Sequence, residues 1–202
     1  MNTQTSDTQM KLSREDLYSL EKYSEIRDEF RSKVMAHKEN RRIELGDNIL
    51  LLFEDKLIMQ YQIQEMLKAE RIFEAEGIKE ELEAYNPLIP DGTNWKCTMM
   101  IQYEDIDVRR EMLSKLLGIE DLVWMQVEGF DKVFAIADED LERSTDDKTS
   151  AVHFMRFELD QEMIAAVKSG ADINCGVDHE NYTCSMTPLL ANIRDSLAAD
   201  LS

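Results

Sequence analysis

Apolar residues in the first half of the chain recur mostly at the spacing of α-helices. They return about every four positions over residues 24–41 and again over residues 55–76, where Gly77 is expected to end the second helix. Between these segments, residues 42–55 carry two β-type runs separated by a Gly-Asp-Asn stretch, a pattern typical of a β-hairpin. The first half is therefore predicted to be helical, with one hairpin.

The pattern changes after the proline-containing stretch YNPLIPDG. Short runs with strand character then alternate with short helical segments. The strands are expected near residues 95–103, 122–127, 133–137, 150–159 and 172–177, and the helices near residues 106–117, 161–168 and 187–201. This order predicts an α+β fold in which an antiparallel sheet is packed with helices. A ferredoxin-like arrangement with one extra strand is one form that such a fold could take.

The same patterns divide the 202 residues into three parts. Residues 1–12 are polar and aperiodic, and we expect a flexible tail there. Residues 13–90 form the mainly helical segment with its hairpin, and residues 91–202 form the α+β segment. A chain of this length can bury one substantial core, so we expect the two segments to pack together as one unit.

The charge of the chain argues against several classes of partner. It has 42 acidic and 23 basic side chains, which gives a net charge of -19. Such a surface repels nucleic acids and anionic membranes. The first residues lack the basic start and apolar stretch of a secretion signal, and no apolar run reaches the ~18 residues that a membrane helix needs. We therefore expect an acidic cytoplasmic protein.

Sequence motifs for common cofactors are absent. The three cysteines, Cys97, Cys175 and Cys184, form no CxxC pair, and the glycines form no nucleotide-binding or serine-hydrolase motif. The three histidines show neither the HExxH nor the ExxH spacing of zinc and di-iron sites. From spacing alone we expect no bound metal and no cofactor. The sequence leaves open whether the protein is an enzyme.

Polar residues at apolar positions of the helices mark a first candidate site. Gln62 and Glu65 fall within the apolar face of the helix predicted over residues 55–76. A buried carboxylate needs a partner or a raised pKa. His37 and Arg41 continue the apolar stripe of the preceding helix, so we expect Glu65 to contact one of them. Two interpretations follow: a buried ion pair that fixes how the helices pack, or a ligand pocket.

A second candidate lies in the predicted strand SAVHFMRFEL. Arg156 interrupts one apolar face of this strand. Its guanidinium could clamp the carboxylate of a ligand or pair with a carboxylate of the protein. The acidic run DEDLERSTDD, which precedes this strand, lacks the glycine and the terminal glutamate of a calcium loop, and we interpret it as a solvated connection.

Five stretches distributed over nearly the whole chain form a specific combination. They are NILLLFED, YQIQEMLKAERI, EAYNPLIP, SAVHFMRFEL and VDHENY, in this order. Together they resemble a bacterial family catalogued as domain of unknown function 3501. The family has no established activity, so the resemblance assigns no catalytic residue. It implies a gene neighbourhood that often contains a rubrerythrin and an iron–sulfur oxidoreductase, and therefore partners that hold the metals in redox or peroxide-stress chemistry.

Two functional hypotheses follow from the sequence. The leading one is a non-catalytic accessory protein that binds a partner, such as a rubrerythrin or an iron–sulfur oxidoreductase, in an iron-dependent redox or peroxide-detoxification system. Its acidic surface would favour a partner with a basic patch. The alternative is a small-molecule-binding protein or enzyme whose site uses the polar residues named above, with a buried Glu65 at its centre. A pocket that touches Glu65 would favour the alternative.

Overall fold

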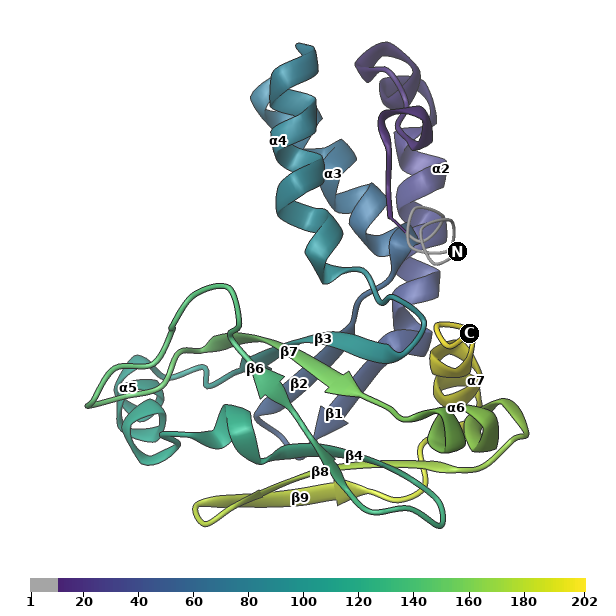
Figure 1. The fold of residues 1–202 in the computed structure, drawn as a ribbon. Coiled ribbons are helices and arrows are strands. Elements are labelled where there is room, and N and C mark those ends of the chain that lie inside the picture. Colours follow the sequence, from purple (N-terminus) through teal and green to yellow (C-terminus); the bar gives the residue numbers. More distant parts are fainter. Residues whose placement is uncertain (1–10) are drawn as a thin grey trace. The chain divides into compact units, whose positions relative to one another are not determined.

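The computed structural model describes residues 11–202, and these fall into two compact units (Figure 1). The first unit holds the described residues up to Asn40 together with Glu54–Gly92. The second unit holds Arg41–Phe53 together with Thr93–Ser202. The chain therefore leaves the first unit and returns to it once before it completes the second.

The flexible tail predicted over residues 1–12 does not include Leu12. Residues 1–10 of this tail lie outside the described residues, but Leu12 is buried in an apolar cluster of the first unit. Its backbone N–H donates to the side-chain oxygen of Asn86 at 2.7 Å, and its carbonyl accepts from the side-chain nitrogen of Asn86 at 2.9 Å. Leu12 is thus part of the first unit.

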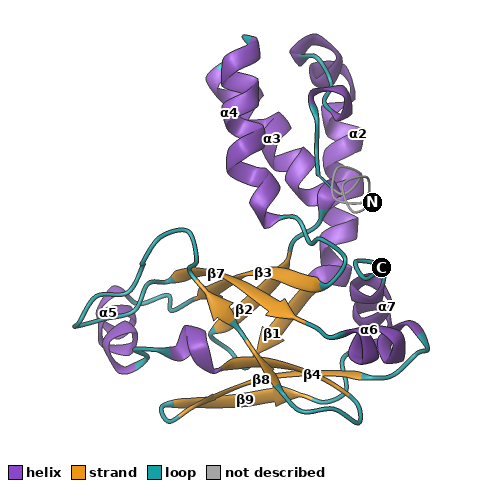
Figure 2. Ribbon diagram, viewed as in Figure 1, coloured by secondary structure: helices purple, strands orange, loops and turns teal. Residues whose placement is uncertain are grey.

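The first unit is helical (Figure 2). Its apolar clusters are formed by helix faces, with Tyr23, Phe30 and Val34 in one cluster and Ile63 and Leu67 in the other. Its α-helices are α2 (Leu20–Lys38), α3 (Lys56–Glu70) and α4 (Ala75–Tyr85), and 3₁₀ turns cover Arg14–Asp16 and Asn86–Leu88.

The helix α3 ends earlier than the sequence pattern predicts. Arg71 adopts the left-handed conformation with φ of 57°, and its backbone N–H closes the helix on the carbonyl of Leu67. Gly77, which we expected to end this helix, lies inside α4. A Cβ atom at Gly77 would come within 2.7 Å of the side chain of Ile72. The glycine therefore allows a close approach of α4 to the preceding loop, and it does not cap a helix.

The second unit contains two antiparallel sheets. The strands are β1 (Arg42–Leu45), β2 (Ile49–Phe53), β3 (Asn94–Ile101), β4 (Val123–Val127), β5 (Val133–Phe134), β6 (Ile136–Ala137), β7 (Val152–Glu158), β8 (Ile173–His179) and β9 (Tyr182–Met186). Their order is β1-β2-β3-β7-β6 in the five-stranded sheet and β5-β4-β8-β9 in the four-stranded sheet. The helices of this unit are α5 (Ile106–Lys115), α6 (Gln161–Lys168) and α7 (Ala191–Ala198), and a 3₁₀ turn covers Ile119–Leu122.

The α+β class is confirmed, with the strands in two sheets where the pattern led us to expect one. The run at residues 133–137 accounts for the difference. Its first two residues pair with β4 and its last two with β7, so the chain passes from one sheet to the other at Ala135. A ferredoxin-like sheet contains a parallel pair of strands. Every strand pair within residues 11–202 is antiparallel, so this arrangement is not the one adopted.

The predicted hairpin forms, but it belongs to the second unit and not to the helical segment 13–90. Its strand β2 pairs with β3, from Ile49 opposite Ile101 to Phe53 opposite Cys97. Sequence patterns favour pairing between neighbours, whereas this partner strand follows two helices. The two sheets lie in two layers (Figure 1). Residues of both sheets and of α7 belong to a single apolar core.

The C-terminal region differs from the prediction at two points. Residues Tyr182–Met186 form β9, where we expected no strand, and the last helix begins at Ala191 and not at Pro188. No helix within residues 11–202 is long and apolar enough to cross a lipid bilayer.

Candidate metal centre

A largely buried group of side chains of the types that can bind a metal ion lies in the second unit. One ligand atom each from Glu120, Asp138 and His153 lie within 4.8 Å of one another. Among residues 11–202, no other three His, Cys or carboxylate residues come together in this way. The three residues come from the 3₁₀ turn Ile119–Leu122, the residue after β6 and the strand β7, so the fold and not the local sequence assembles them.

The backbone around Asp138 holds its carboxylate in place. Asp138 adopts a left-handed conformation with φ of 52°, which aspartate tolerates better than most residues. Its backbone N–H donates to the carbonyl of Phe154 at 2.8 Å, and its carboxylate accepts the backbone N–H of Phe154 at 3.2 Å. The Arg143 guanidinium lies 3.1 Å from the same carboxylate. These bonds fix Asp138 beside β7.

The His153 ring is fully buried, and both of its nitrogens have partners. Nδ1 lies 2.6 Å from the Asp138 carboxylate. Nε2 lies 2.8 Å from Thr149 Oγ1 and 3.0 Å from the carbonyl oxygen of Ser150. A carbonyl oxygen only accepts hydrogen bonds, so the contact with Ser150 places a hydrogen on Nε2.

The buried His179 provides a contrast. Its Nδ1 accepts the backbone N–H of Asn181 at 3.1 Å, and its Nε2 donates to the carbonyl of Leu117 at 3.1 Å. This pattern fits a neutral ring. Only His153 combines a buried imidazole with two neighbouring carboxylates, because Glu120 lies 3.8 Å from its Nε2.

Hydroxyl groups complete the surroundings of Glu120. Ser144 donates to one carboxylate oxygen at 2.5 Å and Thr149 to the other at 2.9 Å. Burial alone would raise the pKa of Glu120, but the hydrogen bond from Ser144, together with His153 and Thr149, holds this pKa below its ordinary value. Glu120 is therefore ionised at neutral pH.

The arrangement comes close to the spacing of an ion-binding site. Two ligands of a tetrahedral ion at ~2.1 Å lie roughly 3.4 Å apart. The distance of 3.8 Å between His153 Nε2 and Glu120 Oε2 is longer than this, and Thr149 Oγ1 lies between them, so the two side chains would move closer to share an ion. Asp138 binds the opposite ring nitrogen, as carboxylates commonly do beside metal-bound histidines. An ion at Nε2 would take the place of the hydrogen there.

The site residues predicted from the sequence lie elsewhere. Glu65 is partly buried, and its carboxylate accepts bonds from Arg27 at 2.6 and 2.8 Å and from Tyr23 Oη at 2.7 Å. The hydrogen bond from Arg27, with that from Tyr23, holds the pKa of Glu65 below its ordinary value. The predicted pairing with His37 or Arg41 is wrong, because Arg27, about two turns into α2, reaches Glu65 instead.

His37 and Arg41 have other partners. His37 Nε2 lies 2.5 Å from the Asp55 carboxylate, which also accepts the backbone N–H of Ile58 at the start of α3. Arg41 is buried in the second unit, where its guanidinium binds the Asp200 carboxylate and the carbonyl oxygens of two further residues. These contacts with groups of the protein itself stabilise the fold.

Arg156 and Gln62 also lie outside the site predicted around Glu65. The Arg156 guanidinium binds the Glu139 carboxylate with two bonds of 2.9 Å and the Glu158 carboxylate with one of 2.5 Å, so it pairs with carboxylates of the protein. Gln62 is half-buried on α3.

A cleft of about 670 Å³ opens in the second unit beside the turn between β1 and β2. None of the five site residues predicted from the sequence lines it: Glu65, Gln62, His37, Arg41 and Arg156.

The observed partners of Glu65 give a revised prediction. Glu65→Ala should lower the free energy of unfolding by about 1–2 kcal/mol, because it removes the ion pair with Arg27 and leaves the buried Tyr23 hydroxyl without this acceptor. Glu70→Ala on the same helix changes an exposed side chain and should cost less than about 0.5 kcal/mol. Chemical denaturation measures both.

A double-variant test identifies the partner. The loss caused by Glu65→Ala should shrink in the Arg27→Met background, because contacting residues are not additive. Unchanged losses in that background would show that Arg27 and Glu65 do not interact in solution.

The sequence contains only a faint signal of the buried cluster. His153 stands on the inner side of its strand with Met155 and Phe157, and a histidine on an apolar face invites a search for partners. Asp138 and Ser144 belong to the acidic run that we interpreted as a solvated connection, and Glu120 belongs to a separate turn. No fixed spacing links the three segments.

Comparison with known proteins identifies similar chains. A family model described as "Protein of unknown function (DUF3501)" matches residues 11–201. A crystal structure of a novel protein of unknown function from Burkholderia pseudomallei is 47% identical in sequence, with a TM-score of 0.89, and the match covers 96% of this chain and 100% of that one. A comparison with the curated proteins found no match.

Proposed function

Because the chain belongs to the DUF3501 family, which is described only as of unknown function, we propose a function from its buried polar cluster: the protein binds one divalent transition-metal ion. The observation that carries this proposal is the convergence of Glu120, Asp138 and His153 from three separate segments. The Glu120 carboxylate and the His153 ring are both buried, and an ion at Nε2 would be shared by these two side chains, with Asp138 on the opposite ring nitrogen.

The donor set indicates the class of ion. His153 Nε2 and the Glu120 carboxylate are the direct ligands, with the hydroxyl oxygens of Thr149 and Ser144 within reach. Imidazole favours zinc and iron, whereas carboxylate and hydroxyl oxygens favour manganese and magnesium. The mixture fits Mn²⁺, Fe²⁺ or Zn²⁺. Asp138 orients the ring and strengthens its Nε2 as a ligand.

The accessory role expected from the family resemblance is compatible with this proposal. A single ion held by a protein without a redox motif suits storage, delivery or a structural role beside a partner that carries out the redox chemistry. We propose that this partner belongs to an iron-dependent redox or peroxide-detoxification system. The net charge of -19 supports it, because it favours a partner with a basic surface.

The proposal is tested by metal content. The purified chain is dialysed separately against Mn²⁺, Zn²⁺ and, without oxygen, Fe²⁺, freed of loosely bound metal and analysed for bound elements. We expect about one ion per chain for at least one of these metals. Glu120→Gln should remove this ion, because the amide is a poor ligand for it.

The matched control is Glu162→Gln, which makes the same substitution at an exposed position in the first turn of α6. It should leave the metal content unchanged. Less than one tenth of an ion per wild-type chain for all three metals, or equal content in wild type and Glu120→Gln, would contradict the proposal.

A further inference from the structure

The outer side of β6 and β7 combines exposed apolar side chains with a surplus of carboxylates. Along β7, side chains alternate between the core and this outer side, so Val152, Phe154 and Arg156 share it. Ile136 of β6 lies opposite Arg156 in the register of the sheet. Leu141 lies in the loop that follows β6 and is 64% exposed.

Exposure makes these apolar side chains available for contact. Ile136 is 41% and Val152 is 38% exposed, and Phe154 is half-buried beneath the Arg143 guanidinium, which lies 4.6 Å from its ring centre. Together with Leu141 they make up a group of exposed and half-buried apolar side chains on β6, β7 and the loop that follows β6, which we call the apolar strip. We call this strip and the carboxylates around it the β6–β7 face.

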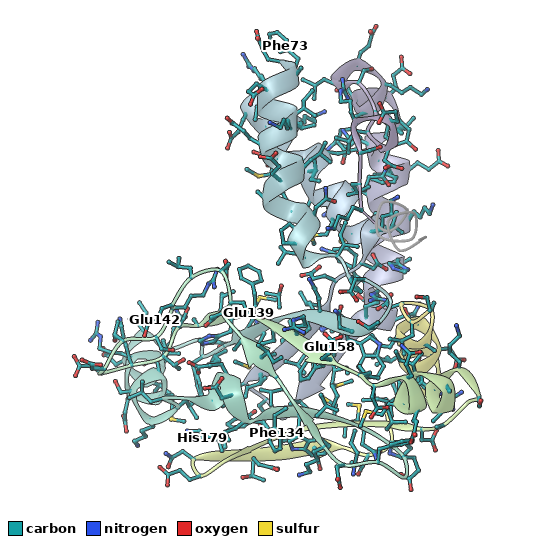
Figure 3. All side chains as sticks on the ribbon, in the orientation of Figure 1. Phe73, Phe134, Glu139, Glu142, Glu158 and His179 are labelled. Carbon is teal, nitrogen blue, oxygen red and sulfur yellow. The ribbon has the colours of Figure 1, made fainter. Side chains whose placement is uncertain are left out.

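The carboxylates of the β6–β7 face outnumber its cations. Glu139, Glu142 and Glu158 line this side of the second unit (Figure 3), and Asp140 follows Glu139 in the loop. The two arginines of the face are already engaged: Arg156 binds Glu139 and Glu158, and Arg143 binds Asp138 and Asp140. Lys96 of β3, opposite Arg156 in the register, is a third cation on this side. The four carboxylates still outnumber the three cations, so the face presents net negative charge around the apolar strip.

The same ion pairs hold the face in a defined shape. The two parallel bonds between Arg156 and Glu139 join the loop to β7, and the contact of Arg143 with Phe154 joins it a second time. A surface that is already ordered loses little conformational entropy on binding. Apolar side chains at the centre and charges at the rim are the usual anatomy of a protein interface.

We propose that the β6–β7 face docks a protein whose surface carries an apolar centre ringed by lysine and arginine. Charge complementarity selects this occupant: the rim is acidic, and the overall charge of -19 steers basic surfaces towards the chain. The proposal does not depend on the metal centre, because none of Ile136, Leu141 and Val152 is a ligand there.

Site-specific cross-linking tests this docking. The full chain carries benzoylphenylalanine in place of Leu141 and is irradiated in its native host. The matched control carries it in place of Phe73, which is 71% exposed in the other unit (Figure 3). We expect one protein with a basic surface to be linked at Leu141 and not at Phe73. A nucleic acid or a lipid at Leu141, equal products at both positions, or no product would overturn the proposal.

Binding of the captured protein in purified form completes the test. Leu141→Ser and Glu142→Lys should each weaken it by about tenfold or more, and Glu162→Lys should not. The association rate should fall from low to physiological salt. Unchanged affinity in Leu141→Ser would overturn the docking site. Metal content is measured on the same variants and should stay at the wild-type value, so failure of docking and failure of metal binding are distinguishable.

Discussion

Arg41→Met should lower the free energy of unfolding by about 3–5 kcal/mol. The guanidinium is 2% exposed, and it binds the carbonyl of Phe53 at 3.0 Å, the carbonyl of Ser196 at 3.2 Å and the Asp200 carboxylate. It thereby joins the start of the β1–β2 hairpin to α7 within the second unit. The substitution removes the counter-charge from a carboxylate that is itself 9% exposed.

The neighbouring Arg42 provides a matched control for this prediction. Its side chain is exposed and pairs only with Glu44 on the same strand among the bonds that the structure describes. Arg42→Met should therefore cost less than about 0.5 kcal/mol. Adding Asp200→Asn to Arg41→Met should recover part of the loss. Similar small losses at both arginines, measured by chemical denaturation, would show that Arg41 is not the link between hairpin and helix.

His153→Leu should have the second large effect. In the presence of a chelator, the loss of the ring leaves the carboxylates of Asp138 and Glu120 buried without the imidazole between them, which we expect to cost about 3–5 kcal/mol. His179→Leu removes a ring that makes two hydrogen bonds to backbone groups, and it should lower the free energy of unfolding by about 1–3 kcal/mol. Asp138→Asn should reduce the loss in the His153→Leu background and not in the His179→Leu background.

The effect of metal ions on stability should distinguish the two histidine variants further. An ion at one hundred times its dissociation constant stabilises the folded chain by about 2.7 kcal/mol. Wild type and His179→Leu should gain this stability when Mn²⁺ or Zn²⁺ replaces the chelator, and His153→Leu should gain none. The same gain in all three proteins would mean that the stabilising ion binds away from His153.

Local patterns predicted those elements whose stability is decided within one segment. The β1–β2 hairpin and α6 lie where spacing and turn residues placed them. The pattern failed where a segment far away in the sequence determines which residues are buried. Gln64 is a polar residue of α3, yet it is buried, because the backbone N–H of Tyr18 lies against α3 and donates to its side-chain oxygen at 2.6 Å.

The candidate site failed to emerge from the sequence for the same reason. A helical wheel identifies Glu65 as a carboxylate in need of a partner, but the pattern of α2 suggested its last turns, whereas Arg27 lies nearer its start. The buried cluster joins His153 to residues from two other segments, and composition alone made one of these look like a solvated loop. Alternation along β7 indicates that His153 faces inward, but not what it meets.

The most direct test of the metal centre is anomalous X-ray scattering from crystals of the full chain grown with Mn²⁺. We expect one strong anomalous peak about 2.0–2.3 Å from both His153 Nε2 and a Glu120 carboxylate oxygen, with Asp138 hydrogen-bonded to the opposite ring nitrogen. Crystals of Glu120→Gln should lack it. If manganese is found only on exposed carboxylates, and no peak lies at His153 and Glu120, the proposed metal centre is contradicted.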